Sequence, residues 1–199
     1  AAVERFDAAE LEFTLRGAAM RLGMDEMLDG VIGPLLLTIG SHWHAGLLSP
    51  AHEHLATAVV RRTLTWMMEN GTPPPMAPAI VVATLAGQTH ELGAMLAAAA
   101  ASSHGWRVVY LGANLPARDI AVAANHTRAT AVALSLLHPT EDPTIADALR
   151  DLRAALPAST AIIAGGTAAA SYAPALAAVG ASRFGSIREL RSWLRGATK

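Results

Sequence analysis

Gly87-Gln88-Thr89-His90-Glu91-Leu92-Gly93 stands between an apolar run at residues 79–84 and an alanine-rich segment at residues 92–102. The apolar run predicts a strand that is buried on both faces of a parallel sheet. The alanine-rich segment has high helix propensity. His90 is therefore expected on a loop at the carboxyl end of the first strand, where open α/β sheets bind their ligands.

Strand-like and helix-like patterns alternate from residue 79 onward. The predicted strands are 79–84, 107–111, 130–136, 160–164 and 181–184, and the predicted helices are 90–103, 117–126, 142–155, 168–178 and 186–195. Five parallel strands joined by crossover helices indicate a doubly wound α/β sheet of the Rossmann type, in the flavodoxin-like strand order. This topology predicts that His90, Gly112, Ser135 and Gly165 lie along one rim of the sheet.

The first 70 residues have a helical pattern throughout, which predicts an all-α part. Asp7 is expected to cap the first helix, and Pro34 is expected to kink or interrupt the second. The three predicted helices run from Asp7 to about Leu22, from Asp25 to about His44, and from Ser49-Pro50 to about Asn70-Gly71.

The clearest domain boundary is the segment 71–78, which contains Pro73, Pro74 and Pro75 in succession. Three consecutive prolines fit neither a helix nor the interior of a sheet, so this segment is predicted to be a stiff linker. The sequence thus predicts a helical bundle at 1–70, a proline-rich linker at 71–78 and a Rossmann-like domain at 79–199.

The composition excludes several classes of function. Fifteen basic residues balance sixteen acidic ones, so there is no general electrostatic case for binding nucleic acid. The chain has no cysteine, which excludes disulfides, thiolate metal sites and cysteine nucleophiles. Residues 154–182 carry no charge, but prolines and glycines interrupt them, so we expect a cytoplasmic protein with no membrane partner. No serine triad, phosphate loop or carboxylate pair suggests hydrolysis, and a role other than catalysis is expected.

The spacing downstream of His90 forms a recognisable pattern. His90-x-x-Gly93 is followed after 41 residues by Ser135-Leu136-Leu137, and after 27 more by Gly165-Gly166. This pattern resembles the cobalamin-binding fingerprint of methionine synthase, the corrinoid methyltransferase proteins and the corrinoid mutases. The resemblance implies that His90 is the lower axial cobalt ligand and that the nucleotide tail of the cofactor enters the protein.

The residue types suit this role. Imidazole is a suitable nitrogen donor for a transition metal. Gly93, Gly165 and Gly166 have no Cβ to obstruct a tail that passes close to the backbone, and Ser135 offers a hydroxyl to it. Leu137 completes the Ser-x-Leu element.

One position departs from the pattern. Many members of the family carry an aspartate two residues before the histidine, where this chain has Gln88. A carboxylate there would orient and polarise the imidazole. Gln88 brings no charge, which puts the basicity of His90 in doubt more than cobalamin binding. His104, His126 and His138 are assigned structural roles, although His138 follows the Ser-x-Leu element and could line the tail pocket.

A second cluster lies in the helical part, where Trp43-His44 precedes Glu53-His54 by eight residues. The turn at 46–49 is expected to bring the four side chains to one end of the bundle. Taken alone, such a cluster would be a polar cap at a helix junction. Beside the cobalamin fingerprint it closely resembles the bundle motif of the CarH/LitR-type photoreceptors, which use adenosylcobalamin to sense light.

This second resemblance implies a role for each residue of the cluster, because the bundle of that family covers the upper face of the corrin. Trp43 would pack against the adenosyl group and Glu53 would bond its ribose. His54 would support the upper pocket or a subunit contact. His44 would bind cobalt as the upper ligand after light has removed the adenosyl group.

The resemblance also implies partners. Family members are light-dependent homo-oligomers, so a dimer or tetramer is expected. Most bind DNA through an N-terminal helix-turn-helix domain that this sequence does not show, so DNA is a partner only through a domain absent from it. The chain, which does not begin with methionine, is expected to be part of something longer. The photocobilin subgroup also holds a bilin, which could be only noncovalent here because there is no cysteine.

Three other functions stay open. The first is a corrinoid protein that carries methyl groups for a methyltransferase, which would not need the Trp43-His44 and Glu53-His54 cluster. The second is a light-independent cobalamin sensor with the same lower ligand. The third is a flavodoxin-like domain without a cofactor, for which the matched spacings would be coincidence.

Overall fold

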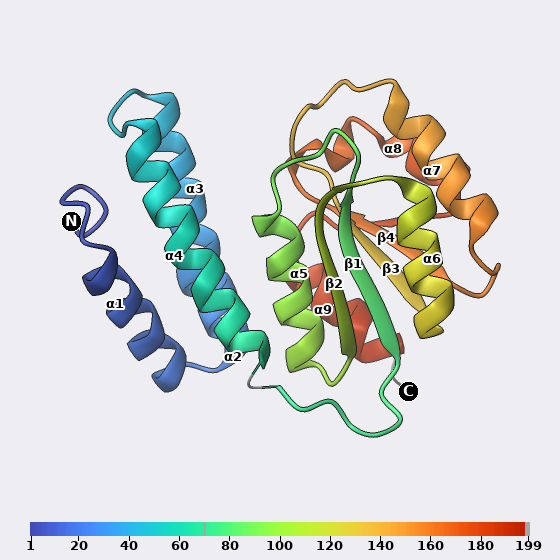
Figure 1. The fold of residues 1–199 in the computed structure, drawn as a ribbon, viewed down its shortest axis with the longest axis horizontal. Helices are drawn as coiled ribbons and strands as arrows, with labels where there is room; N and C mark the ends of the chain where they lie inside the picture. Colours follow the sequence, from blue (N-terminus) through green and yellow to red (C-terminus); the bar gives the residue numbers. More distant parts are fainter. Residues whose placement is uncertain (70, 198–199) are drawn as a thin grey trace. The chain divides into compact units, whose positions relative to one another are not determined.

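The computed structural model describes residues 1–69 and 71–197, and the chain divides into two compact units, Ala1–Gly71 and Thr72–Lys199 (Figure 1). Asn70, the predicted end of the third helix, lies outside the described residues, as do the last two residues of the predicted α/β domain. Within the described residues, no helix has both the length and the apolar character that crossing a membrane requires.

The first unit is helical. Its elements are α1 (Ala8–Arg21), α2 (Met24–Glu26), a π-helix η1 (Met27–Ile32), α3 (Gly33–His44) and α4 (Pro50–Glu69). Helices α1 and α3 both pack against α4 (Figure 1). The predicted N-cap is confirmed, because the side chain of Asp7 accepts a hydrogen bond of 2.8 Å from the backbone N–H of Glu10.

The interruption expected at Pro34 takes the form of the π-helix immediately before it. Proline has no N–H to donate, and its ring obstructs the carbonyl four residues earlier. The Gly33 N–H bonds to the Leu28 carbonyl five residues back, so the helix widens by one residue before Pro34 and α3 continues beyond it.

The second unit is a five-stranded parallel sheet flanked by helices. Its elements are β1 (Ala79–Leu85), α5 (Leu92–Ser103), β2 (Arg107–Leu115), α6 (Ala117–Thr127), β3 (Ala131–Ser135), α7 (Thr144–Ala155), β4 (Ala161–Gly165), a 3₁₀ helix η2 (Thr167–Ala170), α8 (Ala173–Ala178), β5 (Ser182–Arg183) and α9 (Ile187–Ala197). The strand order is β2-β1-β3-β4-β5. Helices α5 and α9 cover one face of the sheet, and α6 and α7 cover the other (Figure 1). The predicted α/β class with an N-terminal helical part is confirmed.

Two predicted elements of this unit are wrong in extent. The second strand, predicted to end at residue 111, reaches Leu115. Gly112, predicted at the rim, therefore lies inside β2, at an irregularity of register where its φ is +86°. The helix predicted at 168–178 is instead η2 followed by α8. A continuous helix is prevented by Pro174, which lies in the first turn of α8 where a missing N–H is tolerated.

The topology determines where a ligand can bind. Strand β1 is buried along its whole length between β2 and β3. The chain leaves β1 toward β2 on one side and later returns to β3 on the other. Loops that diverge in this way leave a crevice outside the carboxyl ends of the strands, and the loop that follows β1 contains His90.

Candidate functional site

The loop after β1 is held in place by hydrogen bonds to β1 and β2. The Asn114 side-chain oxygen accepts a hydrogen bond from the Gly87 N–H at 2.9 Å, and the Asn114 N–H donates to the Thr84 hydroxyl at 2.9 Å. Thr84 in turn donates to the carbonyl of Gln88. Thus the backbone on both sides of the turn is fixed, while the His90 side chain remains exposed.

The side chain of Gln88 forms hydrogen bonds with the loop after β3. It is only 1% exposed, and its Oε1 accepts from the N–H groups of Leu137 at 3.0 Å and His138 at 3.2 Å. Its Nε2 donates to the carbonyl of Pro139 at 3.2 Å. Both ends of the amide are therefore engaged by residues 137–139, and the hydrogen bonds of Gln88 join two neighbouring loops.

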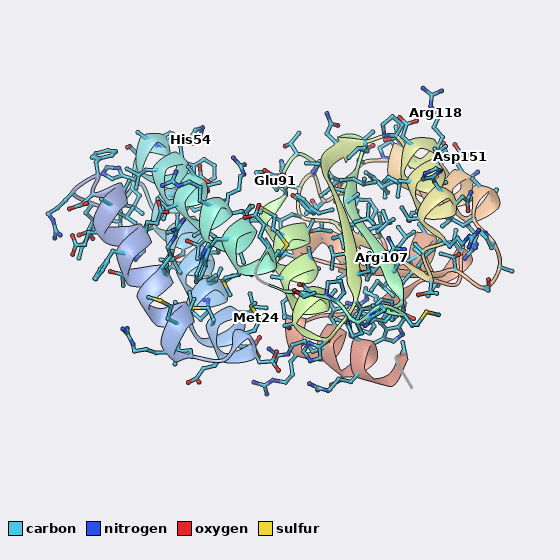
Figure 2. The ribbon with its side chains drawn as sticks, turned by 60° about the horizontal axis from the view of Figure 1, so that its bottom comes forward. Met24, His54, Glu91, Arg107, Arg118 and Asp151 are labelled. Atoms are coloured by element: carbon cyan, nitrogen blue, oxygen red, sulfur yellow. The ribbon has the colours of Figure 1, made fainter. Side chains whose placement is uncertain are left out.

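Two imidazoles meet at this rim. The rings of His90 and His138 are 6.0 Å apart between centroids and nearly perpendicular, at 74°. On the β2 side, the Tyr110 hydroxyl donates to Glu91 Oε2 at 2.7 Å (Figure 2 labels Glu91 at the start of α5). Gly112 lies close to that carboxylate, since a Cβ at this position would be 4.0 Å from Glu91 Oε2.

Ser135 and Gly93 face one another where α5 approaches the end of β3. A Cβ on Gly93 would lie 2.5 Å from the Ser135 Oγ, so the hydroxyl occupies the space that a larger residue at position 93 would need. Ser135 is 5% exposed, and its hydroxyl has no hydrogen-bond partner among the residues that the structure describes. A buried hydroxyl without a partner is energetically unfavourable, so a ligand that supplied one would be stabilised here.

The two glycines after β4 have different structural roles. Gly165 pairs with Ser135, and a Cβ on it would make an ordinary contact of 3.5 Å with the Phe184 carbonyl. Gly166 has a φ of +101°, and its Cβ would lie 2.2 Å from the carbonyl oxygen of Leu136. Close approach of two backbones therefore requires glycine at position 166 even before any ligand is considered.

A third hydrogen-bonded group flanks the β3 loop. The Tyr172 hydroxyl donates to the Pro139 carbonyl at 2.8 Å and accepts from the Asp142 N–H at 2.9 Å. Asp142 accepts from both the hydroxyl and the backbone N–H of Thr144, and these hydrogen bonds lower the pKa of its carboxyl group from the ordinary value of 3.8.

In the helical unit, the histidine at the end of α3 has one ring nitrogen engaged. The Nδ1 of His44 is 2.8 Å from the carbonyl oxygen of Gly40. A carbonyl can only accept, so Nδ1 is the donor of this contact, and in the neutral imidazole Nε2 is then the nitrogen that keeps a lone pair. The Trp43 ring lies edge-on to His44, with centroids 4.9 Å apart, and Trp43 is 45% exposed.

The second pair of the helical cluster lies at the start of α4, where Figure 2 labels His54. Glu53 accepts from the Thr57 hydroxyl at 2.6 Å through one oxygen and contacts the His54 Nδ1 at 2.8 Å through the other. The His54 side chain is 80% exposed. The neighbouring His52 caps the turn, because its Nδ1 accepts from the Ser49 N–H at 3.1 Å.

The structure thus gathers the predicted residues at two places. His90, Gly93, Ser135, Leu137, Gly165 and Gly166 lie at or beside the carboxyl ends of β1, β3 and β4, and Trp43, His44, Glu53 and His54 lie at the α3–α4 connection. The sequence reasoning missed the hydrogen-bonding roles of Thr84, Tyr110 and Asn114. A polar residue within or next to an apolar strand was the available signal for each of them.

The match with known families agrees with this geometry. Residues 78–186 match the family described as "B12 binding domain", and residues 1–66 match a second family with the same description. The chain belongs to the B12-binding family. Its α/β unit contains the matched B12 binding domain, and the residues of the predicted fingerprint lie at the rim described above.

Curated relatives of this B12-binding chain include two HTH-type transcriptional repressors of Myxococcus xanthus. CarA is 31% identical over 189 residues, which cover 94% of this chain and 63% of CarA. CarH is 31% identical over 172 residues, which cover 86% of this chain and 57% of CarH. The chain therefore spans less than two thirds of the length of these relatives.

Among solved structures, the monomethylamine corrinoid protein of Methanosarcina barkeri has the same fold. It matches with a TM-score of 0.76 over 98% of this chain and 94% of its own, at 16% sequence identity.

The residues present fit a cobalamin. His90 is an exposed imidazole at the switch point of the sheet, where it could bind cobalt. The Ser135 hydroxyl has no hydrogen-bond partner among the described residues and lies beside Gly93, which has no side chain. This hydroxyl could form a hydrogen bond with a polar part of the nucleotide tail. Both features belong to the B12-binding domain itself.

Proposed function

We propose that this B12-binding chain is a light-sensing module that uses adenosylcobalamin and regulates transcription or another output through a change of assembly. The observation that carries the proposal is the state of His44. Its Nδ1–H is held by the Gly40 carbonyl, which leaves Nε2 with a free lone pair on an exposed side chain beside Trp43. This is the tautomer and exposure that a histidine needs to bind a metal by Nε2.

The proposal gives a role to residues of each unit. His90 would bind the cobalt, and Ser135 would receive the nucleotide tail. Trp43 would pack its indole against the adenosyl group, and Glu53 would accept hydrogen bonds from the ribose. Adenosylcobalamin supplies the photochemistry when bound, through homolysis of its cobalt–carbon bond.

His44 would respond to the loss of the adenosyl group. Its Nε2 would be the nitrogen available to bind cobalt. A change in cobalt ligation can change the oligomeric state of the chain, provided that the two ligation states differ in their contacts. The similarity to the HTH-type repressors CarA and CarH supports transcription as the output.

The test is made on the full chain saturated with adenosylcobalamin in darkness. Absorbance spectra and size-exclusion profiles are recorded before and after green light. In air-saturated buffer, where dissolved oxygen can oxidise the cob(II)alamin that homolysis leaves, we expect a stable cob(III)alamin spectrum after illumination together with a changed oligomer. His44→Ala should bind the cofactor in the dark but lose that stable product, whereas His42→Ala on the same helix should behave as the wild type.

Other outcomes contradict the proposal and favour a different function. A chain that binds cobalamin but keeps its assembly in light would not be a photoreceptor, and a methyl-group carrier would then be favoured. A change of assembly on cobalamin binding that light does not reverse would indicate a light-independent sensor. A long-wavelength absorption band in the protein as purified would indicate an additional noncovalent bilin.

A further inference from the structure

His138 lies next to the proposed cobalt ligand without an assigned function. It immediately follows the Ser135-Leu136-Leu137 element, and its side chain is exposed. Its ring centroid is 6.0 Å from that of His90, edge to face. Two hydrogen-bonded imidazoles have centroids about 5 Å apart, since an N–H···N separation of about 2.9 Å adds to the two ring radii. The observed centroid separation exceeds that value by about 1 Å, so one ring must turn to bring a nitrogen of each into hydrogen-bonding distance.

The side chains on either side of His90 are engaged elsewhere. A metal-bound histidine usually donates its second ring N–H to an acceptor, which orients the ring and raises its basicity. Gln88, which could have been that acceptor, has its Oε1 bonded to two backbone N–H groups and its Nε2 bonded to the Pro139 carbonyl. The carboxylate of Glu91 accepts from Tyr110 on the β2 side.

The backbone of His138 is fixed in a way that presents its ring to His90. The His138 N–H donates to the buried Gln88 at 3.2 Å, and the carbonyl of the next residue, Pro139, accepts from both Gln88 and Tyr172. The ring itself is exposed, so burial does not prevent it from turning toward His90.

We propose that His138 is the positioning residue of His90, accepting its second ring N–H when His90 binds cobalt. Gln88 then acts on His90 indirectly, because its hydrogen bonds hold the loop that carries His138. The inference rests on the proposed role of His90 as lower ligand. Because a neutral imidazole is a weaker acceptor than a carboxylate, the His90–cobalt bond is weaker than one supported by an aspartate.

The test uses the full chain, labelled with ¹⁵N-histidine or unlabelled, and loaded with cob(II)alamin in the dark. Electron paramagnetic resonance reports a protein nitrogen on cobalt through a splitting that changes with the label, and a titration gives the Kd for cobalamin. Removing such an outer partner typically costs 10- to 100-fold in metal affinity. We therefore expect His138→Ala to raise the Kd about tenfold and to reduce the fraction of cobalt that carries the histidine splitting.

Two variants separate positioning from a merely structural effect. His138→Asn keeps a hydrogen-bond acceptor and should restore most of the affinity and the splitting. His126→Ala removes another exposed histidine, near the end of α6, and should change neither quantity.

Three results would overturn the inference. His138→Ala could have the Kd and the spectrum of the wild type, which would leave His138 without a positioning role. His90→Ala could keep a splitting that His138→Ala removes, which would make His138 the ligand itself. A wild-type spectrum without any label-dependent splitting would instead refute the role of His90, and with it the proposed function.

Discussion

The rim of the sheet and the α3–α4 connection hold their functional side chains in different ways. At the rim, hydrogen bonds join residues that are far apart in sequence, such as Gln88 with Leu137 and Gly87 with Asn114. At the α3–α4 connection, His44 bonds four residues back, Thr57 bonds Glu53, and Glu53 contacts its neighbour His54. The rim is a tertiary arrangement, whereas the helical cluster is made of bonds within single helices.

Burial follows the same division. Gln88 and Ser135 are almost completely buried, whereas Trp43, His44 and His54 are exposed. A buried hydrogen-bond network is costly to rearrange, because a polar group that loses its partner stays buried without a hydrogen bond. Exposed side chains with local bonds can change partners at little cost. The rim thus suits a permanent cofactor site, and the helical cluster suits the part that responds to a change in the cofactor.

The largest effect is expected from Gly166→Ala at the rim. The left-handed backbone at position 166 and the contact of 2.2 Å with Leu136 together predict a loss of roughly 3–5 kcal/mol in the free energy of unfolding. Urea denaturation of the apoprotein measures it. Gly180→Ala is the matched control, because Gly180 has a φ of +67° and nothing within 4 Å, and should lose only about 1–2 kcal/mol. Equal losses in the two variants would show that the close approach is unimportant.

Gln88→Ala tests whether the rim depends on its long-range bonds. The change leaves two N–H groups without their partner and removes one of the two donors to the Pro139 carbonyl, which predicts a loss of about 2–4 kcal/mol in the free energy of unfolding. Thr57→Val removes a local bond from the helical cluster and should cost about 1 kcal/mol or less, since water can replace the hydroxyl beside Glu53. If the two variants lost the same stability, the distinction between the regions would not hold.

Ser135→Ala should separate stability from binding. It removes a buried hydroxyl without a partner among the described residues, so the apoprotein should be as stable as the wild type or more stable by about 0.5–1 kcal/mol. Cobalamin affinity should fall roughly tenfold, as expected for one lost hydrogen bond. Ser159→Ala, in the exposed loop before β4, should alter neither quantity. A stability loss without a change in affinity would assign Ser135 to the fold alone.

The smallest effect is expected for Asp142→Asn, and it depends on pH. The hydrogen bonds from Thr144 lower the pKa of Asp142 in the folded chain, so the ionised carboxylate stabilises the fold above its unfolded pKa of about 3.8. That contribution is lost as the pH falls through the lower, folded pKa. The wild type should therefore have the higher Tm at pH 7, and the difference should disappear in strong acid. A difference in Tm that is independent of pH would exclude the charge as its cause.

Much of the fold could be predicted because it follows local patterns. The buried run of β1 and the cap at Asp7 each depend on a few adjacent residues. The length of β2 could not be predicted, because residues 112–115 extend the strand through pairing with β1 despite Gly112 and Asn114 at positive φ. The division of the helix predicted at 168–178 could not be predicted either. The residue pattern of this segment is helical, but Pro174 restricts where α8 begins.

The sequence alone determined the identity and spacing of the residues that characterise a cobalamin site, since His90, Gly93, Ser135 and Gly165-Gly166 follow from the motif itself. It also determined the parallel sheet that places them at one rim. Only the tertiary structure decided how they are supported: that Gln88 holds the β3 loop, that Ser135 fills the space beside Gly93, and that His138 faces His90. Periodicity is a property of neighbouring residues, whereas a hydrogen bond across some 50 residues exists only once the strands are paired.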